Sequence, residues 1–126
     1  SFMPPATHSG GLRYHGMAPM VSHLTDIGAI EAKAFGQKEC FEAGVKFANA
    51  EGIIPAPEAT HAVKGAIDAV LECKKNGQSK TILFNLCGHG HFDMQAYGDY
   101  FDNKLTDDSY NESEVNKALE KLPKIA

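Results

Sequence analysis

The sequence lacks tryptophan, has few cysteines and carries no excess of basic residues. Its 126 residues include 12 Lys and Arg against 16 Asp and Glu, which gives a formal net charge of −4. A nucleic-acid or membrane-surface partner needs a clustered basic face, so we expect no nucleic-acid and no membrane partner. No apolar run approaches the roughly 18 residues of a membrane span, and the first residues lack the basic and apolar regions of a signal peptide. We therefore expect a cytoplasmic protein.

The cysteines are three in number and widely spaced, at Cys40, Cys73 and Cys87. This pattern fits reduced thiols better than a disulfide framework. With 43% apolar and 22% charged residues, the composition is that of one ordinary folded domain. The chain nevertheless opens on Ser1, not on Met, within a segment rich in Pro and Gly. We therefore expect a processed chain or a piece of a longer one.

The hydrophobic pattern predicts a single α/β fragment over residues 1–126. Residues 1–19 are predicted to be an irregular loop because Pro and Gly interrupt them too often for a helix or strand. Residues 20–101 are predicted to form the α/β core, and residues 102–126 a C-terminal linker and helix. The capping box Asn111-x-x-Glu114 marks the start of that last helix.

Within the predicted core, helices and strands alternate. Periodicity and end signals predict helices over 20–27, 37–50, 58–75 and 92–100. The third of these is predicted to point its apolar face inward, with Ala62, Val63, Ala66, Ile67, Val70 and Leu71. Strands are predicted over 29–35, from alternation, and over 80–86, whose nearly unbroken apolar run is typical of a buried strand in a parallel sheet. Two strands are too few for such a sheet, which again indicates missing neighbours.

A glycine-rich turn, Cys87-Gly88-His89-Gly90-His91, follows the second predicted strand, where ligands bind in open α/β sheets. The residues allow three interpretations. The turn is a plain connection with solvated histidines, a metal site of Cys87, His89 and His91, or a cradle in which glycines let backbone N–H groups approach a cofactor or anion. Interleaved glycines bend the backbone and weaken the metal interpretation.

Two further positions are candidates for a site. Arg13, in the stretch 10–16, is either a surface charge or a residue that holds a carboxylate bidentately. Glu58 is either a favourable charge at a helix N-terminus or a site residue, and His61 fits an exposed helix position. There is no nucleophile elbow, P-loop or Rossmann fingerprint. A Cys87 nucleophile with His89 or His91 as its base would lack an orienting third group.

Three ordered motifs carry a family resemblance: residues 11–19 (GLRYHGMAP), 51–62 (EGIIPAPEATHA) and 84–93 (FNLCGHGHFD). They resemble the C-terminal part of the tryptophan synthase β chain, in its second, divergent class. Residues 118–124 (ALEKLPK) are similar to the terminus of that class. The motifs span most of the chain in the right order, although they cover the last third or less of the family's length.

The resemblance implies the C-terminal part of a type II pyridoxal-phosphate fold, with few parallel strands flanked by helices. It implies a pyridoxal-phosphate-dependent lyase that makes L-tryptophan from L-serine and indole by β-replacement. A homodimer is implied as well, and an α subunit and a monovalent cation are compatible with it.

The resemblance also assigns cofactor-binding residues. Cys87 stands where the family usually has a Ser that hydrogen-bonds the pyridine nitrogen. Cysteine is the weaker hydrogen-bonding group, so we expect a weaker or indirect contact here. Gly88 matches the glycine beside it, and Glu58 matches a Glu near the cofactor ring.

Other positions match the substrate and cation sites of the family. Tyr14 and Gly16 match residues whose backbone carbonyls serve a monovalent-cation site. Arg13 is expected near the substrate, because it stands where the first class has an Asp that responds to the substrate hydroxyl. This departure is typical of the divergent class.

No catalytic residue is expected in this chain. In the family, the Schiff-base lysine, the general acid/base Glu and the phosphate-binding loop all precede the matched segment, and no counterpart lies here. We therefore expect the chain alone to be inactive, and its uncovered apolar surface to cause self-association. The alternatives are a non-catalytic α/β ligand-binding or interaction module, and a small metal protein that uses Cys87, His89 and His91.

Overall fold

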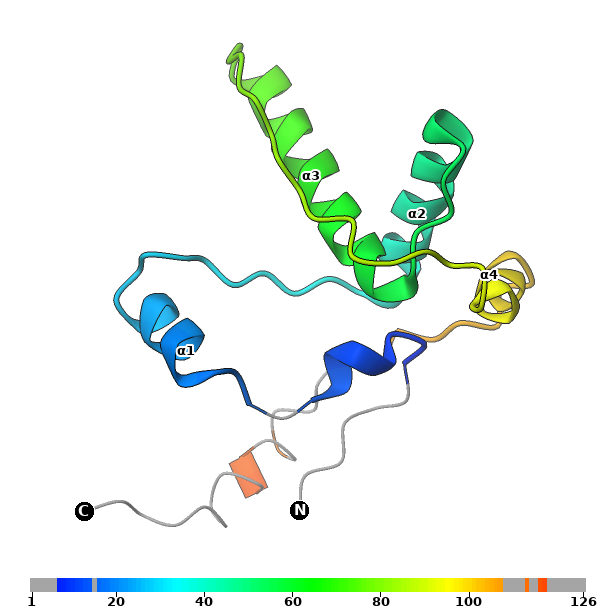
Figure 1. Ribbon diagram of the computed structural model, residues 1–126, viewed down its shortest axis with the longest axis horizontal. Helices are drawn as coiled ribbons and strands as arrows, with labels where there is room; N and C mark the ends of the chain where they lie inside the picture. Colours follow the sequence, from blue (N-terminus) through cyan, green and yellow to red (C-terminus); the bar gives the residue numbers. More distant parts are fainter. Residues whose placement is uncertain (1–6, 15, 108–112, 114–115, 118–126) are drawn as a thin grey trace.

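The computed structural model describes residues 7–14, 16–107, 113 and 116–117, and the regular structure in these residues is helical. A 3-10 turn, η1 (Gly10–Arg13), is followed by the helices α1 (Pro19–Asp26), α2 (Gln37–Glu51), α3 (Pro57–Lys75) and α4 (Met94–Phe101) (Figure 1). None of these helices is long and apolar enough to cross a bilayer. The predicted capping box Asn111-x-x-Glu114 and the residues 118–124 lie outside the described residues.

The four helices predicted within residues 20–101 are confirmed to within a few residues, because their end signals are local. The Glu39 side chain reaches back to accept a 2.8 Å hydrogen bond from the Gly36 N–H at the start of α2, as in half of a capping box. Gly52 ends this helix in the left-handed conformation, at φ 72°, where glycine is favoured. Pro57 opens α3 at the first helical position, where its missing N–H costs nothing.

The prediction of an α/β fold is wrong, and so is the parallel sheet implied by the resemblance: the described residues form no strand. Residues 29–30 bond only back to the end of α1, and residues 79–87 make no backbone hydrogen bond to any described residue. Residues 29–30 form a bend, and residues 31–35 and 80–86 have no regular secondary structure. An alternating or apolar pattern favours extended backbone, but a strand exists only where a neighbour completes its hydrogen bonds.

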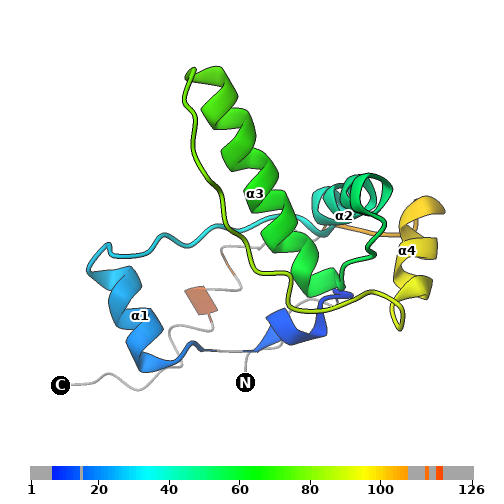
Figure 2. The same ribbon diagram turned by 45° about the horizontal axis from the view of Figure 1, so that its top comes forward.

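The extended segment after α3 runs back along that helix (Figures 1 and 2). Alternate side chains lean inward, so Ile82, Phe84 and Leu86 are half-buried. Leu83, between them, is 96% exposed. The apolar run that predicted a strand buried on both faces is therefore covered on one face only.

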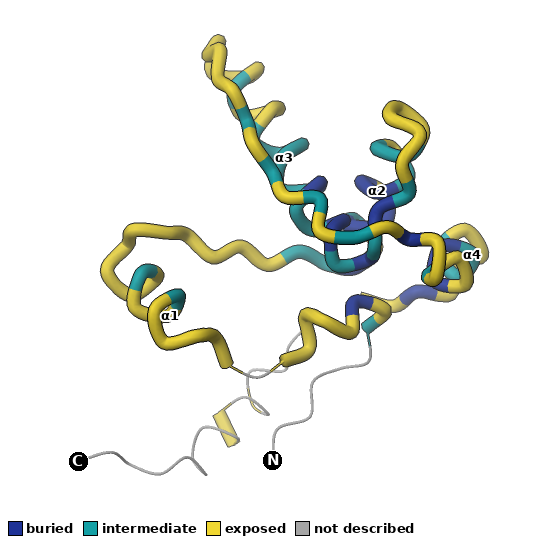
Figure 3. The backbone as a smooth tube through the Cα atoms, viewed as in Figure 1, coloured by how far each residue is buried: buried dark blue, intermediate teal, exposed yellow. Residues whose placement is uncertain are grey.

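The helices α2 and α3 diverge from a common base, and the core lies at that base (Figures 1 and 3). There the side chains of Phe41, Ala96, Tyr97 and Leu105 form a buried cluster. The rings of Phe41 and Tyr97 meet edge to face with centroids 5.0 Å apart, a favourable aromatic geometry. The core therefore joins α2 to α4 and to the segment that follows α4.

Away from the base, the space between α2 and α3 is an open apolar groove of about 200 Å³. The prediction that Val70 and Leu71 point inward is wrong, because they are 52% and 56% exposed. Diverging helices cannot cover both ends of an apolar face. The groove is lined by Phe47, Val63, Ala66, Ile67, Val70, Leu71 and Phe84.

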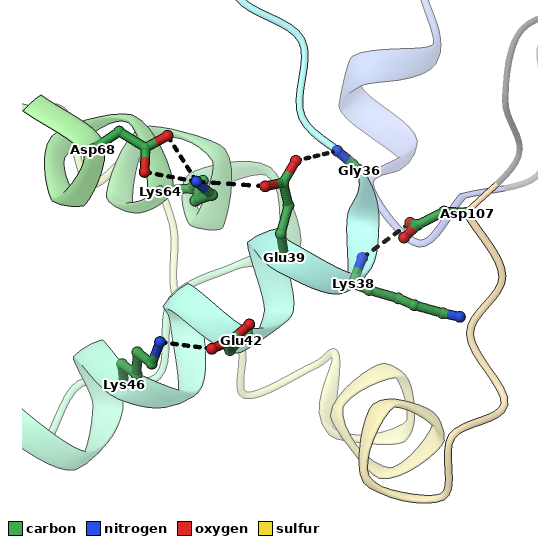
Figure 4. Close-up of polar contacts among 8 residues, drawn as sticks. All are labelled: Gly36, Lys38, Glu39, Glu42, Lys46, Lys64, Asp68 and Asp107. Atoms are coloured by element: carbon green, nitrogen blue, oxygen red, sulfur yellow. Dashed lines mark hydrogen bonds and ion pairs between the residues drawn. The ribbon is translucent and has the colours of Figure 1, made fainter.

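Polar contacts at the base connect α2 to α3 and to the segment that follows α4 (Figure 4). The Lys64 ammonium of α3 lies 2.6 Å from Asp68 Oδ1 and 3.4 Å from Glu39 Oε2 of α2. The hydrogen bond that Lys64 donates to Asp68 is the main reason that the pKa of Lys64 is raised. At the N-terminus of α2, the Lys38 N–H donates a 3.1 Å hydrogen bond to Asp107 Oδ1. A residue 69 positions away thus caps this helix.

Candidate functional site

The segments 54–56 and 88–90, which belong to two of the sequence motifs, lie against each other at the N-terminus of α3. The Ala56 N–H donates to the Gly88 carbonyl at 2.9 Å, and the Gly90 N–H donates to the Ile54 carbonyl at 2.7 Å. These two bonds frame an antiparallel bridge between Pro55 and His89. They fix the glycine-rich turn to the residues that lead into α3.

Gly90 fits this contact because it has no side chain. A Cβ atom at this position would lie 2.6 Å from the Pro55 carbonyl oxygen and 2.8 Å from Ile54 Cγ2. In the cradle interpretation, the glycines of the turn leave room for a ligand. At Gly90 the close approach is instead to the chain's own backbone.

The motif at residues 11–19 is connected to the same place by a hydrogen bond to Glu58, which lies in the first turn of α3. Its Oε1 atom accepts a 2.9 Å hydrogen bond from the Gly11 N–H of η1. Arg13 stands at the end of η1 and is exposed. The structure therefore brings Glu58 together with the turn that carries Arg13.

Two of the predicted cofactor-binding residues, Cys87 and Gly88, lie in the turn that contacts the residues before α3. Cys87 is exposed and directly precedes Gly88. A Cβ atom at position 88 would lie 3.1 Å from the Cβ of Ala56, so the turn and the start of α3 are in close contact. Cys87 and Gly88 thus lie beside the residues that lead directly to Glu58.

Tyr14 and Gly16 follow η1 in the sequence, and both are exposed. Tyr14 is exposed, and Gly16 has a φ of 98°, a conformation that glycine adopts most readily. The structure shows no contact between these two residues and the turn at 87–91.

Among the described residues, no group of three or more His, Cys, Asp or Glu side chains could hold a metal ion. The rings of His89 and His91 lie 4.9 Å apart, and that of His89 lies 5.5 Å from Phe92. The metal interpretation of Cys87, His89 and His91 is therefore wrong for this arrangement. His61 is half-buried, and its Nδ1 lies 3.1 Å from the Pro57 carbonyl.

Tyr97 is a residue of this site that the sequence did not reveal. Its hydroxyl donates a 2.6 Å hydrogen bond to the Pro55 carbonyl. Burial raises the pKa of this phenol to about 12, and the charge of Asp93 adds to the effect. Tyr97 lies in a predicted helix, but no local pattern shows that its hydroxyl meets a carbonyl in another motif.

The comparisons with known proteins show that the chain is similar to one part of tryptophan synthase beta chains. No family model matches the chain. It is 57% identical over 103 residues to the tryptophan synthase beta chain 2 of Methanosarcina mazei, which is 82% of this chain and 23% of that relative. It is 57% identical over 106 residues to the same protein of Aquifex aeolicus, and 51% over 104 residues to that of Methanothermobacter thermautotrophicus. The chain spans about a quarter of the length of the curated relatives it matches, 23% or 24%.

Proposed function

Because this chain is homologous to one part of tryptophan synthase beta chain 2, we propose that it is the C-terminal part of such an enzyme and forms one wall of its pyridoxal-phosphate site. The observation that carries the proposal is the meeting of three motifs at the N-terminus of α3, through Ala56–Gly88, Gly90–Ile54 and Gly11–Glu58. Identity above 50% to the relatives supports it.

The complete enzyme, in this proposal, is a cytoplasmic homodimer that makes L-tryptophan from L-serine and indole. An α subunit is a further partner of that enzyme. These activities belong to the whole protein, of which the chain would supply the C-terminal part.

The residues present fit one edge of the cofactor. Cys87 is exposed, and its neighbour Gly88 has no side chain, so a flat ring can reach the thiol. We assign Cys87 to the pyridine nitrogen; a thiol, unlike a carboxylate, leaves this nitrogen unprotonated. When bound, pyridoxal phosphate supplies the electron sink for replacing the serine hydroxyl. Gly88 and Glu58 complete the part of the cofactor site that we assign to this chain.

The substrate and cation would be held by the segment that contains η1. Arg13 is exposed, and its guanidinium can bind a carboxylate such as that of serine with two hydrogen bonds. The carbonyls of Tyr14 and Gly16 would serve a monovalent cation, because carbonyl oxygen is the ligand type that such hard cations take.

The chain alone is proposed to be inactive. The lysine that binds the cofactor, the general acid/base and the phosphate-binding loop are expected in the preceding part of the enzyme. If, after pyridoxal phosphate is added, borohydride fixes the cofactor to one lysine of the 126-residue chain, this part of the proposal is wrong.

A chimera tests the activity. The matched residues of the Methanosarcina mazei β chain 2 are replaced by those of this chain, and the product is assayed for tryptophan from serine and indole. We expect activity and growth of a tryptophan auxotroph that lacks its own β chain. The same scaffold with the segment deleted is the control. A folded chimera that binds pyridoxal phosphate but forms no tryptophan would contradict the proposal and favour a non-catalytic binding module.

A further inference from the structure

We propose that Glu58 is a positioning residue, which fixes η1, and with it Arg13, through the backbone N–H of Gly11. This inference rests on the proposed function, because it assigns Arg13 to the substrate. This positioning role is separate from the place near the cofactor ring that the resemblance assigns to Glu58. The first evidence is the 2.9 Å hydrogen bond from Gly11 N to Glu58 Oε1, across 47 residues of sequence.

The turn η1 itself contains no buried residue, although Ser9 before it is buried. It is four residues long, and its N-cap, Ser9, makes no side-chain capping bond. The Leu12 N–H donates to the Ser9 carbonyl at 3.0 Å, one of the i→i+3 bonds of the 3-10 turn, whose geometry is poorer than that of α-helical bonds. A hydrogen bond to a charged carboxylate is stronger than one to a neutral carbonyl. Glu58 therefore adds a bond from another element to those that order this turn.

The Gly11 position is fitted to the carboxylate. A Cβ atom there would lie 3.2 Å from Glu58 Cγ and 3.3 Å from Oε1, whereas one at Gly10 would meet nothing within 4 Å. The φ of Gly11 is not in the left-handed region, so the backbone conformation does not demand glycine here. The close approach of Glu58 leaves little room instead, so a side chain at position 11 would shift the carboxylate.

Glu58 follows a stretch of backbone that hydrogen bonds from two other segments hold in place. It belongs to the first turn of α3, directly after Pro57. The residues before it are held by the Gly88 carbonyl, through Ala56 N, and by the Tyr97 hydroxyl, through the Pro55 carbonyl. A side chain on a rigid element positions its partner better than one on a loop. Arg13, two residues after Gly11, is therefore placed relative to the turn at 87–91.

The hydrogen bond can be tested on the 126-residue chain by NMR, without any activity. The amide proton signal of Gly11 is compared in the wild type, Glu58→Gln and Glu58→Ala, with that of Gly10 as internal reference. Glutamine keeps an acceptor oxygen at the same length, so we expect the Gly11 signal to move upfield in Glu58→Ala and to move much less in Glu58→Gln. An equal Gly11 signal in all three proteins would overturn the inference.

The positioning role is tested in the chimera described above by steady-state kinetics. We expect Glu58→Ala to raise the KM for serine about tenfold, the loss expected for one hydrogen bond to a charged group, while the KM for indole stays the same. Glu58→Gln should raise the serine KM far less. Gly11→Ala should resemble Glu58→Ala, and Gly10→Ala, the matched control, should resemble the unmodified chimera.

Two outcomes of these experiments would contradict the inference, and each would give Glu58 a different role. If Glu58→Gln lowers kcat as much as Glu58→Ala and changes the pH profile, Glu58 transfers a proton and the inference is wrong. If Glu58→Ala lowers the melting temperature with an unchanged serine KM, its role is structural only, and the inference is again wrong. An inactive unmodified chimera would count against the proposed function, and the Gly11 signal then decides the hydrogen bond.

Discussion

Tyr97 and Pro55 lie 42 residues apart in the sequence, and the Tyr97 hydroxyl donates a 2.6 Å hydrogen bond to the Pro55 carbonyl. Pro55 is fully buried and precedes α3. A proline cannot donate a backbone hydrogen bond, and its carbonyl here has a side-chain partner. This bond connects α4 to the start of α3, where the three motifs meet.

Removal of that bond should destabilise the chain. In Tyr97→Phe the Pro55 carbonyl stays buried and loses its donor, so we expect the free energy of unfolding to fall by about 1–2 kcal/mol. Urea denaturation followed by circular dichroism measures the change. Tyr100→Phe is the matched control, because the Tyr100 hydroxyl has no hydrogen bond among the described residues. Equal effects of the two substitutions would contradict the role given to the Tyr97 hydroxyl.

The same phenol should make stability depend on pH in the alkaline range. The pKa of Tyr97 is about 12 in the folded chain, above its ordinary value of 10.0. The folded state therefore keeps a proton that the unfolded state loses, and stability falls as the pH rises from 10 towards 12. The melting temperature of Tyr97→Phe should fall less steeply over this range than that of the wild type. Cys40 titrates in both proteins, so parallel curves would show that Tyr97 does not contribute.

The three thiols should react in the order of their exposure. Cys87 is exposed, Cys73 is half-buried and Cys40 is buried. Burial, with the charge of Glu39 adding to it, raises the pKa of the Cys40 thiol to about 12, so about one part in ten thousand is thiolate at pH 8. A disulfide reagent followed by mass spectrometry should modify Cys87 first, and Cys40 only after urea is added. Early modification of Cys40 in the folded chain would contradict the packing of α2 against α3.

A single methyl group at Gly44 should disturb the contact between α2 and α3. A Cβ atom there would lie 2.7 Å from Thr60 Cγ2 and 3.0 Å from the Tyr97 hydroxyl oxygen. We expect Gly44→Ala to cost about 1–3 kcal/mol, as overpacking does, despite the better helix propensity of alanine. Gly98→Ala in α4 is the control, since a Cβ there meets nothing within 4 Å. It should be neutral or stabilise by about 0.5–1 kcal/mol. Thermal unfolding of both variants decides between these outcomes.

The sequence predicted the helices well because their signals lie within a few residues of one another. Gly52 and Pro57 mark the end of α2 and the start of α3 by their own backbone preferences. The strand predictions were wrong because a strand needs a second segment to pair with, whereas a hydrophobic pattern describes one segment only. Residues 80–86 fit a strand in composition, but among the described residues they have no strand beside them with which to form backbone hydrogen bonds.

The three motifs that meet at the N-terminus of α3 could be identified from the sequence, but their contacts could not. The motifs that contain Arg13, Glu58 and Cys87 were identified from the sequence, and the structure brings their segments to the N-terminus of α3. The hydrogen bond between Gly11 and Glu58, and the contact of Gly90 with Pro55, join residues that no periodicity relates. Only the folded backbone shows them.

The contact between Ala56 and Gly88 limits how this sequence can change over evolutionary time. A Cβ atom at position 88 would lie 3.1 Å from the Cβ of Ala56, so the two positions together have room for one methyl group. A lineage can keep that methyl at position 56, as here, or transfer it to position 88 with glycine at 56. The order of the two mutations then matters. An intermediate with alanine at both positions would have two Cβ atoms in close contact, whereas an intermediate with glycine at both would have no such contact.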